Sequence, residues 1–347
     1  MPLSKIKTNS VADEVFEVGP NFIINGAMQV AVRGTSAVAA GAGTYPSIDR
    51  WKAWEDSDGA FTVEQSTTAP VGFSTSLKAQ VTTADTSLAA AQYAQLSQQI
   101  EAQNLQSLAY GTNDAKTVTL SFYVRSSKTG SYSITIYKSD ATSYLFSKSY
   151  TIDSADTWER KSITITPDSN IKASGGAIAN DTGIGFYVFW NLAGGTNYDD
   201  ATDNTWSANT SHFHTSSQVN WMDNTSNNFY LTGVQLEVGE VATPFQHRSY
   251  AQEKIDCFRY YYRYTTTDNP GTRNRWLFTI DDNDNYRRCT HTFPVVMRGT
   301  PAVTVSFYSS FGSGRGTQHI NCHGTDCYVD GESQYAYYTD LVADAEL

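Results

Sequence analysis

The clearest pattern in the chain is a strict alternation of apolar and polar residues that starts at Thr117. The apolar positions are Val118, Leu120, Phe122 and Val124 in the first run, then Tyr132, Ile134 and Ile136, and then Ile163 and Ile165. A period of two residues with one apolar face is typical of strands in a sheet that is covered on one side. Because short polar turns separate these runs, they predict an antiparallel β-sandwich.

Other segments predict further strands around this core. Residues 184–190 are apolar at odd and even positions alike, as in a central strand that is covered on both faces. Residues 93–101 favour a strand, with a helix as the alternative, and a brief helical turn is expected at 104–108. A first strand is expected to begin within 21–29, and another at Phe61 after an Asp-Gly turn.

Residues 228–248 mark the boundary between two β-domains. The run 229–238 alternates like a strand, and Pro244, which lacks a backbone donor, ends the sheet after it. Ser249 and Gln252 have the spacing of a capping box, which predicts a short helix directly after them.

These patterns divide the chain into an N-terminal arm, 1–20, a large β-domain, 21–250, and a smaller β-sandwich, 251–347. The arm has too few apolar residues to fold alone, so it is expected to become ordered on a neighbouring protein. The expected contact residues of the arm are Met1, Leu3, Ile6 and Val11.

Composition agrees with sheet and excludes two partner classes. Charged residues are 17% of the 347, whereas the chain has 22 Tyr and 16 Phe, a bias that favours strands. The net charge of −11 argues against nucleic acid, because phosphate binding needs clustered Lys and Arg. Neither a signal peptide nor a run of 18 apolar residues is present, so no membrane insertion is expected.

The metal-binding residue types form two weak groups. His319, Cys322, His323 and Cys327 are zinc-ligand types, but their spacing matches no zinc-finger pattern, and strand thiols beside surface histidines explain them better. Residues 281–285 alternate oxygen ligands as a calcium loop does, yet they lack the glycine and the distal glutamate of an EF-hand. No cofactor is therefore predicted, and the four cysteines are expected to be free thiols.

Three motifs carry a resemblance to a known class of proteins. Residues 21–26 (NFIING), followed by Arg33-Gly34-Thr35 and by Asp49-Arg50-Trp51, resemble the N-terminal signature of jelly rolls in phage tail fibres and related virion appendages. GVQLEVGEVATPFQHR, residues 233–248, resembles the junction that closes such a jelly roll. FPVVMR, residues 293–298, resembles a motif of the C-terminal fibre domains.

This resemblance implies an all-β protein in which a carbohydrate-binding-module-like jelly roll precedes a smaller C-terminal β-sandwich. It also implies a structural virion protein of a tailed phage, most simply a short tail fibre or receptor-binding protein that acts as a homotrimer. The arm would then bind a tail adaptor or nozzle, and the particle would adhere to host surface polysaccharide. Such jelly rolls often hold one structural calcium ion, but no residue here is assigned to it.

Glycan binding directs attention to tryptophans, because sugar C–H faces stack on aromatic rings. The candidate platform is Trp51, Trp206 and Trp221, with His212 and His214 as polar neighbours. The two histidines and two of the tryptophans lie in the long polar stretch 191–228, a type of segment that often carries function. The alternative is that these tryptophans fill the sandwich core or a subunit interface.

Two other functions are weighed against the tail fibre. A head fibre or capsid decoration protein fits the short arm and the lack of a shaft, and would place the chain on the capsid surface. A glycan-cleaving appendage would need paired carboxylates in an aromatic setting, and no such pair stands out. The chain is therefore expected not to be an enzyme.

Overall fold

The computed structural model describes residues 20–265, 279–280, 286–307, 315–330 and 338–347. Residues 1–19, which include Met1, Leu3, Ile6 and Val11 of the predicted arm, and the candidate calcium loop 281–285 lie outside the described residues. Antiparallel strands make up most of the regular secondary structure in the described part, so the prediction of an all-β chain is confirmed. No helix in these described ranges is both long enough and apolar enough to span a bilayer.

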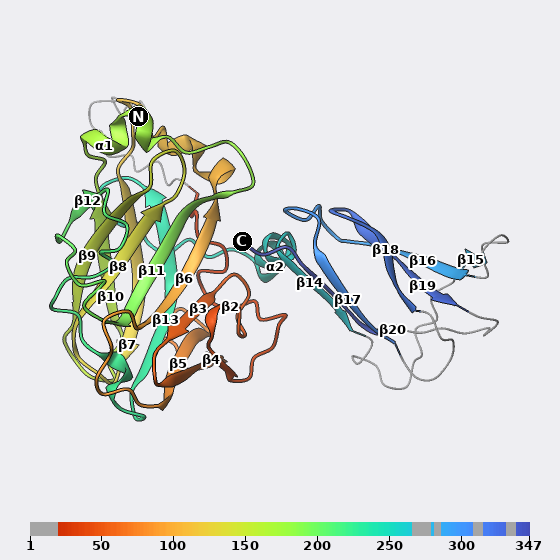
Figure 1. Cartoon of the computed structure of the whole chain (residues 1–347), viewed down its shortest axis with the longest axis horizontal. Helices are drawn as coiled ribbons and strands as arrows, with labels where there is room; N and C mark the ends of the chain where they lie inside the picture. Colours follow the sequence, from red (N-terminus) through yellow and green to blue (C-terminus); the bar gives the residue numbers. More distant parts are fainter. Residues whose placement is uncertain (1–19, 266–278, 281–285, 308–314, 331–337) are drawn as a thin grey trace, which may run out of the picture.

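Two sheets form the larger domain, at the left of Figure 1. The six-stranded sheet has the order β1 (Val38–Ala39), β4 (Ala60–Ser66), β5 (Ser76–Thr83), β13 (Asn228–Val238), β7 (Val118–Ser126) and β10 (Glu159–Ile165). The seven-stranded sheet has the order β12 (Thr205–Ser207), β9 (Tyr144–Ile152), β8 (Gly130–Lys138), β11 (Ile184–Gly194), β6 (Tyr93–Glu101), β3 (Lys52–Asp56) and β2 (Ala42–Thr44). Neighbours that are distant in sequence, such as β13 and β5, give the layout of a jelly roll.

The core between the sheets follows the alternation in the sequence. Val118, Leu120, Phe122 and Val124 on β7 are all fully buried, as are Tyr132, Ile134 and Ile136 on β8. Residues 184–190 open β11, the middle strand of its sheet, so the prediction of a central strand is confirmed. The strand β9 was not predicted, because Ser147, Lys148 and Ser149 interrupt its apolar pattern.

The prediction that a first strand begins within 21–29 is wrong. This segment turns instead, because Asn25 and Met28 adopt left-handed backbone angles, with φ of 58° and 57°. It still packs on β13, since the Asn21 side chain accepts from Leu236 N and donates to Val234 O. The Gly26 backbone lies so close to the Val234 carbonyl that a Cβ would come within 2.1 Å of its oxygen. Close backbone packing therefore replaces sheet pairing here.

Within residues 20–265, five short helical segments connect the strands. They are η2 (Ala102–Leu108), α1 (Ser169–Lys172), η3 (Ser174–Gly176), η4 (Trp221–Asp223) and α2 (Tyr250–Phe258). The turn predicted at 104–108 is the second half of η2, and α2 is the predicted seam helix. The Ser249 hydroxyl accepts from Gln252 N as an N-cap, whereas the Gln252 side-chain amide donates to Asp256.

The described residues of the smaller domain, at the right of Figure 1, form two further sheets. One has the order β14 (Tyr261–Thr265), β20 (Tyr338–Asp344) and β17 (Ala302–Phe307). The other has the order β15 (Thr279–Ile280), β16 (Tyr286–Thr292), β19 (Gly324–Asp330) and β18 (Arg315–Asn321). Phe293, Met297, Cys327, Leu341 and Ala343 form the described core of this domain.

Candidate functional site

The three predicted platform tryptophans lie in the core of the jelly roll. Trp51 is 1% exposed, Trp206 4% and Trp221 fully buried. Each packs against another aromatic ring: Trp51 on Trp190 at 5.3 Å between centroids, Trp206 on Phe146 at 5.4 Å, and Trp221 on Phe61 at 5.7 Å. The prediction that these rings form a sugar platform is wrong, and the alternative, that they fill the core, is what the structure shows.

The two histidines lie beside the sheet without forming a shared site. His212 is half-buried, and its Nε2 lies 2.8 Å from the Asn209 amide nitrogen. His214 is buried with Nδ1 3.1 Å from Thr215 O, and burial lowers the pKa of its imidazole. Both belong to a segment, His212–Val219, which crosses the outer face of the seven-stranded sheet and is called the crossing segment below.

The outer face of the seven-stranded sheet presents a different set of rings. Trp54 on β3, Tyr137 on β8, and Tyr187 and Phe189 on β11 all point away from the core. They form a continuous row: Tyr137 to Tyr187 is 5.5 Å between centroids, Tyr187 to Phe189 is 5.7 Å with parallel planes, and Phe189 to Trp54 is 6.2 Å. These four residues are called the aromatic strip below. Trp54, Tyr137 and Tyr187 are half-buried, so parts of their rings remain open.

Strand pairing explains why these rings meet. Tyr187 lies directly opposite Tyr137 on one side and Gln99 on the other, and Phe189 lies opposite Thr135 and Ser97. Residues that face each other across neighbouring strands share one side of the sheet and contact each other. The strip is therefore a consequence of register, because residues from β3, β8 and β11 reach one surface only once these strands pair.

Amides and hydroxyls surround the rings. The Trp54 indole donates to the Ser97 hydroxyl at 2.8 Å, which fixes the plane of the ring. Gln95 donates to Asn191 Oδ1 at 2.8 Å, and Asn191 Nδ2 donates to Thr135 Oγ1 at 2.9 Å. Buried polar groups that are paired in this way hold a fixed geometry, because breaking one bond leaves a desolvated partner.

The crossing segment borders the strip on the side of β8 and β9. The Phe213 carbonyl accepts from Ser147 Oγ at 2.8 Å and from Asn191 Nδ2 at 3.2 Å, and the Phe213 ring packs edge-on against Phe189 at 5.3 Å. The Thr215 and Ser149 hydroxyls lie 3.0 Å apart. Part of the polar stretch 191–228 is thus the wall of the candidate site.

The chemistry of the strip suits binding. Its four side chains are aromatic and none is a carboxylate, so the strip itself supplies no acid and base pair. Burial raises the pKa of the Tyr187 phenol, which therefore stays neutral at physiological pH. Neutral rings next to amide and hydroxyl groups are the combination that recognises the C–H faces and hydroxyls of a sugar.

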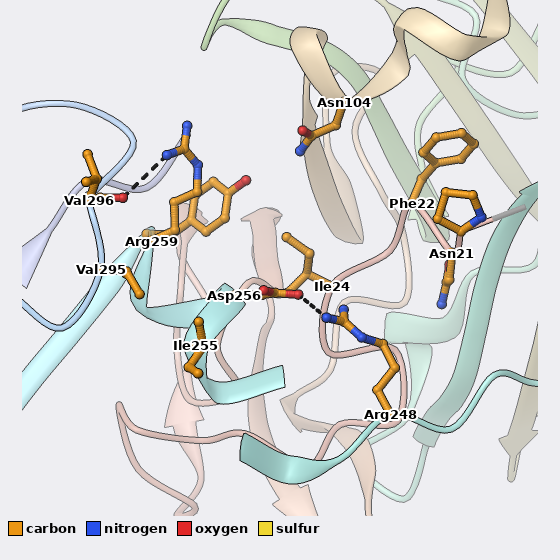
Figure 2. A pocket seen from close by; sticks show the side chains of 12 residues that line it. Asn21, Phe22, Ile24, Asn104, Arg248, Ile255, Asp256, Arg259, Val295 and Val296 are labelled. Carbon is orange, nitrogen blue, oxygen red and sulfur yellow. Dashed lines mark hydrogen bonds and ion pairs between the residues drawn. The ribbon is translucent and has the colours of Figure 1, made fainter. Parts of the chain in front are cut away.

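A second depression lies at the seam between the domains. The pocket of about 440 Å³ is lined by residues of the 20–24 segment, η2, α2 and the 295–296 loop. Figure 2 shows Arg248 and Arg259 on its wall, and both guanidinium groups already have acidic partners. Arg248 pairs with Asp256 at 2.5 Å, and Arg259 pairs with Glu101 at 2.8 Å. The pocket is therefore a junction between the domains, and its two arginines are already paired with carboxylates of this chain.

The candidate zinc residues are dispersed: His319 lies on β18, Cys327 on β19, and Cys322 and His323 in the turn between these strands. His319 is exposed and pairs with Asp326 at 2.9 Å, while Cys327 is buried and lies opposite Cys289. Cys322 packs beside the small core, and the His323 backbone N–H donates to Asn321. The four cysteine thiols are unpaired. Within the described ranges, no three His, Cys, Asp or Glu side chains gather in one place.

The amino-acid sequence contains a signal for the aromatic strip. Residues 184–190 were interpreted as buried on both faces because aromatic and aliphatic residues occupy both parities. Tyr187 and Phe189 share the parity that faces outward, as Tyr137 does on β8. Aromatic residues at outward positions of two strands indicate a surface platform, but only the pairing of those strands shows that they are neighbours.

No family model matches the sequence, and no curated protein matches it. Among solved structures, the chain is similar to the enzymatically active domain of bacteriophage CBA120 tailspike protein 4, at 11% identity and a TM-score of 0.32 over 63% of this chain and 21% of that chain. It is also similar to TmCBM61 in complex with β-1,4-galactotriose, at 12% identity and a TM-score of 0.31 over 63% of this chain and 99% of that one.

A third similar structure is the C-terminal family 22 carbohydrate-binding module of Clostridium thermocellum Xyn10B, at 14% identity and a TM-score of 0.30, over 64% of this chain and 94% of that one. All three TM-scores lie below 0.5, so nothing about the ligand of this chain follows from these likenesses.

Proposed function

We propose that this protein binds glycans through the aromatic strip on the outer face of its seven-stranded sheet. The observation that carries the proposal is the continuous row of Trp54, Phe189, Tyr187 and Tyr137, partly open and set among amides and hydroxyls. The rings offer stacking surface for sugar C–H faces, and fixed polar groups beside them would orient the hydroxyls.

The ligand class that fits best is a neutral polysaccharide. The strip residues carry no charge, and Ser97, Gln99 and Asn191 beside them are hydroxyl and amide groups that match sugar hydroxyls. Lys52 Nζ lies 4.7 Å from the centre of the Trp54 ring but already donates to Leu347 O, whereas an acidic polysaccharide would need free cations next to the rings to offset its desolvation. The absence of carboxylates from the strip supports adhesion over cleavage at this place.

In its finer form, the proposal is a structural virion protein of a tailed phage, a short tail fibre or receptor-binding protein. The sequence resemblance of residues 21–26, 233–248 and 293–298 supports it. Weak sites on three identical subunits would gain avidity by engaging one polysaccharide surface together. Immunogold imaging of intact particles tests the location: label at the tail is expected, and label on the capsid would favour the head-fibre alternative.

The binding proposal is tested by affinity gel electrophoresis against a polysaccharide panel: a β-glucan, a galactan, a mannan and an α-glucan as neutral members, with alginate and hyaluronan as acidic ones. Tyr187→Ala is expected to weaken binding of the best neutral member by roughly fivefold, because a stacking contact contributes about 1 kcal/mol. The matched control is Tyr123→Ala, a half-buried tyrosine on β7 in the other sheet.

The control variant should bind like the unmodified protein. Equal affinity of both variants and the unmodified protein, or no binding to any member of the panel, would contradict the proposal. Tighter binding to the acidic members than to the neutral ones would contradict the ligand class.

A further inference from the structure

The chain end of the smaller domain lies on the larger one. After β20 ends at Asp344, the Ala345 backbone pairs with Tyr260 O at 2.8 Å, and Arg298 donates to the carbonyls of Ala345 and Glu346 at 2.8 and 3.0 Å. Figure 1 shows this end between the two domains, beside α2. Residues 345–347 are called the C-terminal segment below.

Glu346 anchors this segment to the jelly roll. Its carboxylate pairs with Arg50, which is 1% exposed, and with Arg33 at 3.2 Å. The Arg50 guanidinium also donates to Gln99 O at 2.6 Å and stacks over the Tyr260 ring at 3.5 Å. An ion pair that is this deeply buried holds its members in one arrangement, because separating them leaves charges without water or a partner.

Leu347 then reaches the edge of the aromatic strip. Its backbone oxygen accepts from the Tyr45 hydroxyl and from Lys52 Nζ, each at 3.1 Å. With the Gln99 amide oriented so that both of its ends are satisfied, its nitrogen also donates to Leu347 O at 2.6 Å. Gln99 lies directly opposite Tyr187, and Lys52 Nζ lies 4.7 Å from the centre of the Trp54 ring.

We infer that the C-terminal segment is a positioning element of the glycan-binding face, so that the smaller domain sets the affinity of the larger one. The inference rests on the proposed function of the strip. The segment holds Gln99, opposite Tyr187, and Lys52, beside Trp54, in fixed rotamers. A ligand then meets a preorganised surface and does not lose affinity to ordering these two long side chains.

The segment and the crossing segment lie at opposite sides of the strip. The crossing segment covers β8 and β9, whereas the C-terminal segment contacts β6 and β3 through Gln99 and Lys52. The second border therefore comes from a domain that contributes no ring to the strip. A jelly roll produced without residues 251–347 would retain all four rings but lack this border.

Two full-length variants test the inference. Deletion of residues 346–347 removes the anchor and the contacts of Leu347. Tyr45→Phe removes only the hydroxyl that joins Gln99 to Leu347 and keeps the ring. The matched control is Asp340→Asn. Asp340 lies on β20, the strand that leads into the C-terminal segment, and the substitution breaks its ion pair with Arg263 on β14, away from the strip.

Affinity for the best-bound neutral polysaccharide of the panel is expected to fall roughly tenfold in the deletion and about two- to threefold in Tyr45→Phe, which corresponds to the loss of one or more hydrogen bonds. Asp340→Asn should stay within about twofold. Hydrogen exchange, which needs no ligand, is expected to quicken in peptides that cover residues 45–56 of the deletion variant and to stay unchanged in β7.

The outcomes distinguish a failure of this inference from a failure of the proposed glycan binding. If Tyr187→Ala loses binding while the deletion and Tyr45→Phe retain full affinity, the positioning role is wrong and the glycan face stands. If no panel member binds the unmodified protein, or Tyr187→Ala binds normally, the proposed function fails and the inference fails with it. Unchanged exchange in residues 45–56 also contradicts the positioning role. Should the deletion variant not fold, Tyr45→Phe decides.

Discussion

Asp49 is an ionisable residue that the fold buries completely. It is fully shielded from solvent, its carboxylate accepts from Val32 N at 2.5 Å, and Arg33 Nε lies 3.7 Å away. In the sequence it is part of the Asp-Arg-Trp triplet that carries the resemblance. The structure gives a physical reason for each residue of the triplet. Asp49 accepts a hydrogen bond from the backbone of the 30–33 segment, Arg50 forms an ion pair with Glu346, and Trp51 fills the core.

Burial raises the pKa of Asp49 from 3.8 to about 7, against the lowering effects of its bond to Val32 N and of Arg33; Glu346 raises it further. Between pH 4 and 7 the folded protein therefore binds more protons at this carboxyl than the unfolded chain does. The stability that this residue contributes is complete below pH 4 and is lost as pH rises through 7.

Asp49→Asn removes the titration, because the amide cannot ionise. The free energy of unfolding of the unmodified protein, relative to that of the variant, is expected to fall by up to about 1.4 kcal/mol per pH unit between pH 4 and 7, and to level off above. Chemical unfolding of both proteins at half-unit pH steps measures this difference. A difference that stays constant, or that grows with pH, would show that Asp49 is ionised when folded.

The strand β13 connects the six-stranded sheet across its middle. It pairs with β5 through residues 228–231 and with β7 on its other side, and the register shifts between Thr232 and Gln235. Gly233 lies in this irregularity with φ of +60°, a conformation that favours glycine. The alternating pattern predicted this strand correctly, but alternation cannot show that a bulge interrupts it.

Gly233→Ala should destabilise the protein by about 2 kcal/mol or more. A Cβ at this position would meet Phe73 Cζ at 2.6 Å and Tyr123 Cδ2 at 2.9 Å, and the backbone angle adds strain. Gly299→Ala is the control, because nothing lies within 4 Å of its Cβ position. Thermal and chemical unfolding compare the two, and equal stability of both variants would contradict the strained bulge.

At the scale of the whole molecule, buried ion pairs join the two domains. Arg259, just after α2, forms a two-bond pair with Glu101 at the end of β6, at 2.8 and 2.9 Å. The Glu101 side chain is fully buried, and hydrogen bonding by Arg259 holds its pKa below the usual range despite burial. Arg50 and Glu346 form a second buried pair across the same interface.

Arg259→Ala is expected to cost about 3 kcal/mol of unfolding free energy, because it leaves a buried carboxylate without a partner. Arg263→Ala is the matched control: Arg263 makes the same two-bond pair with Asp340, at 2.9 Å, but Asp340 is 25% exposed and the loss should stay below about 1 kcal/mol. Chemical unfolding of the two variants measures the difference, and equal losses would mean that the domains are not joined through Glu101.

Much of the architecture could be predicted from local patterns. Strands β7, β8, β10, β11 and β13 follow from alternation or from apolar runs, and α2 follows from its N-cap, because these signals lie within a few neighbouring residues. Strand β9 could not be predicted in this way, because Ser147 and Ser149 interrupt its apolar pattern. Their hydroxyls form hydrogen bonds with Phe213 and Thr215 of the crossing segment, a contact that exists only in the folded protein.

The sequence by itself determined the all-β class, the inward faces of the main strands and the position of the seam, because each depends on periodicity or on a single Pro, Ser or Gly. Tertiary structure alone decided which aromatic residues reach the surface. Trp206 and Trp221 entered the core, whereas Tyr187, Tyr137 and Trp54 came together on the outer face. Strand order brings together residues that are far apart in the chain, so no local pattern encodes that surface.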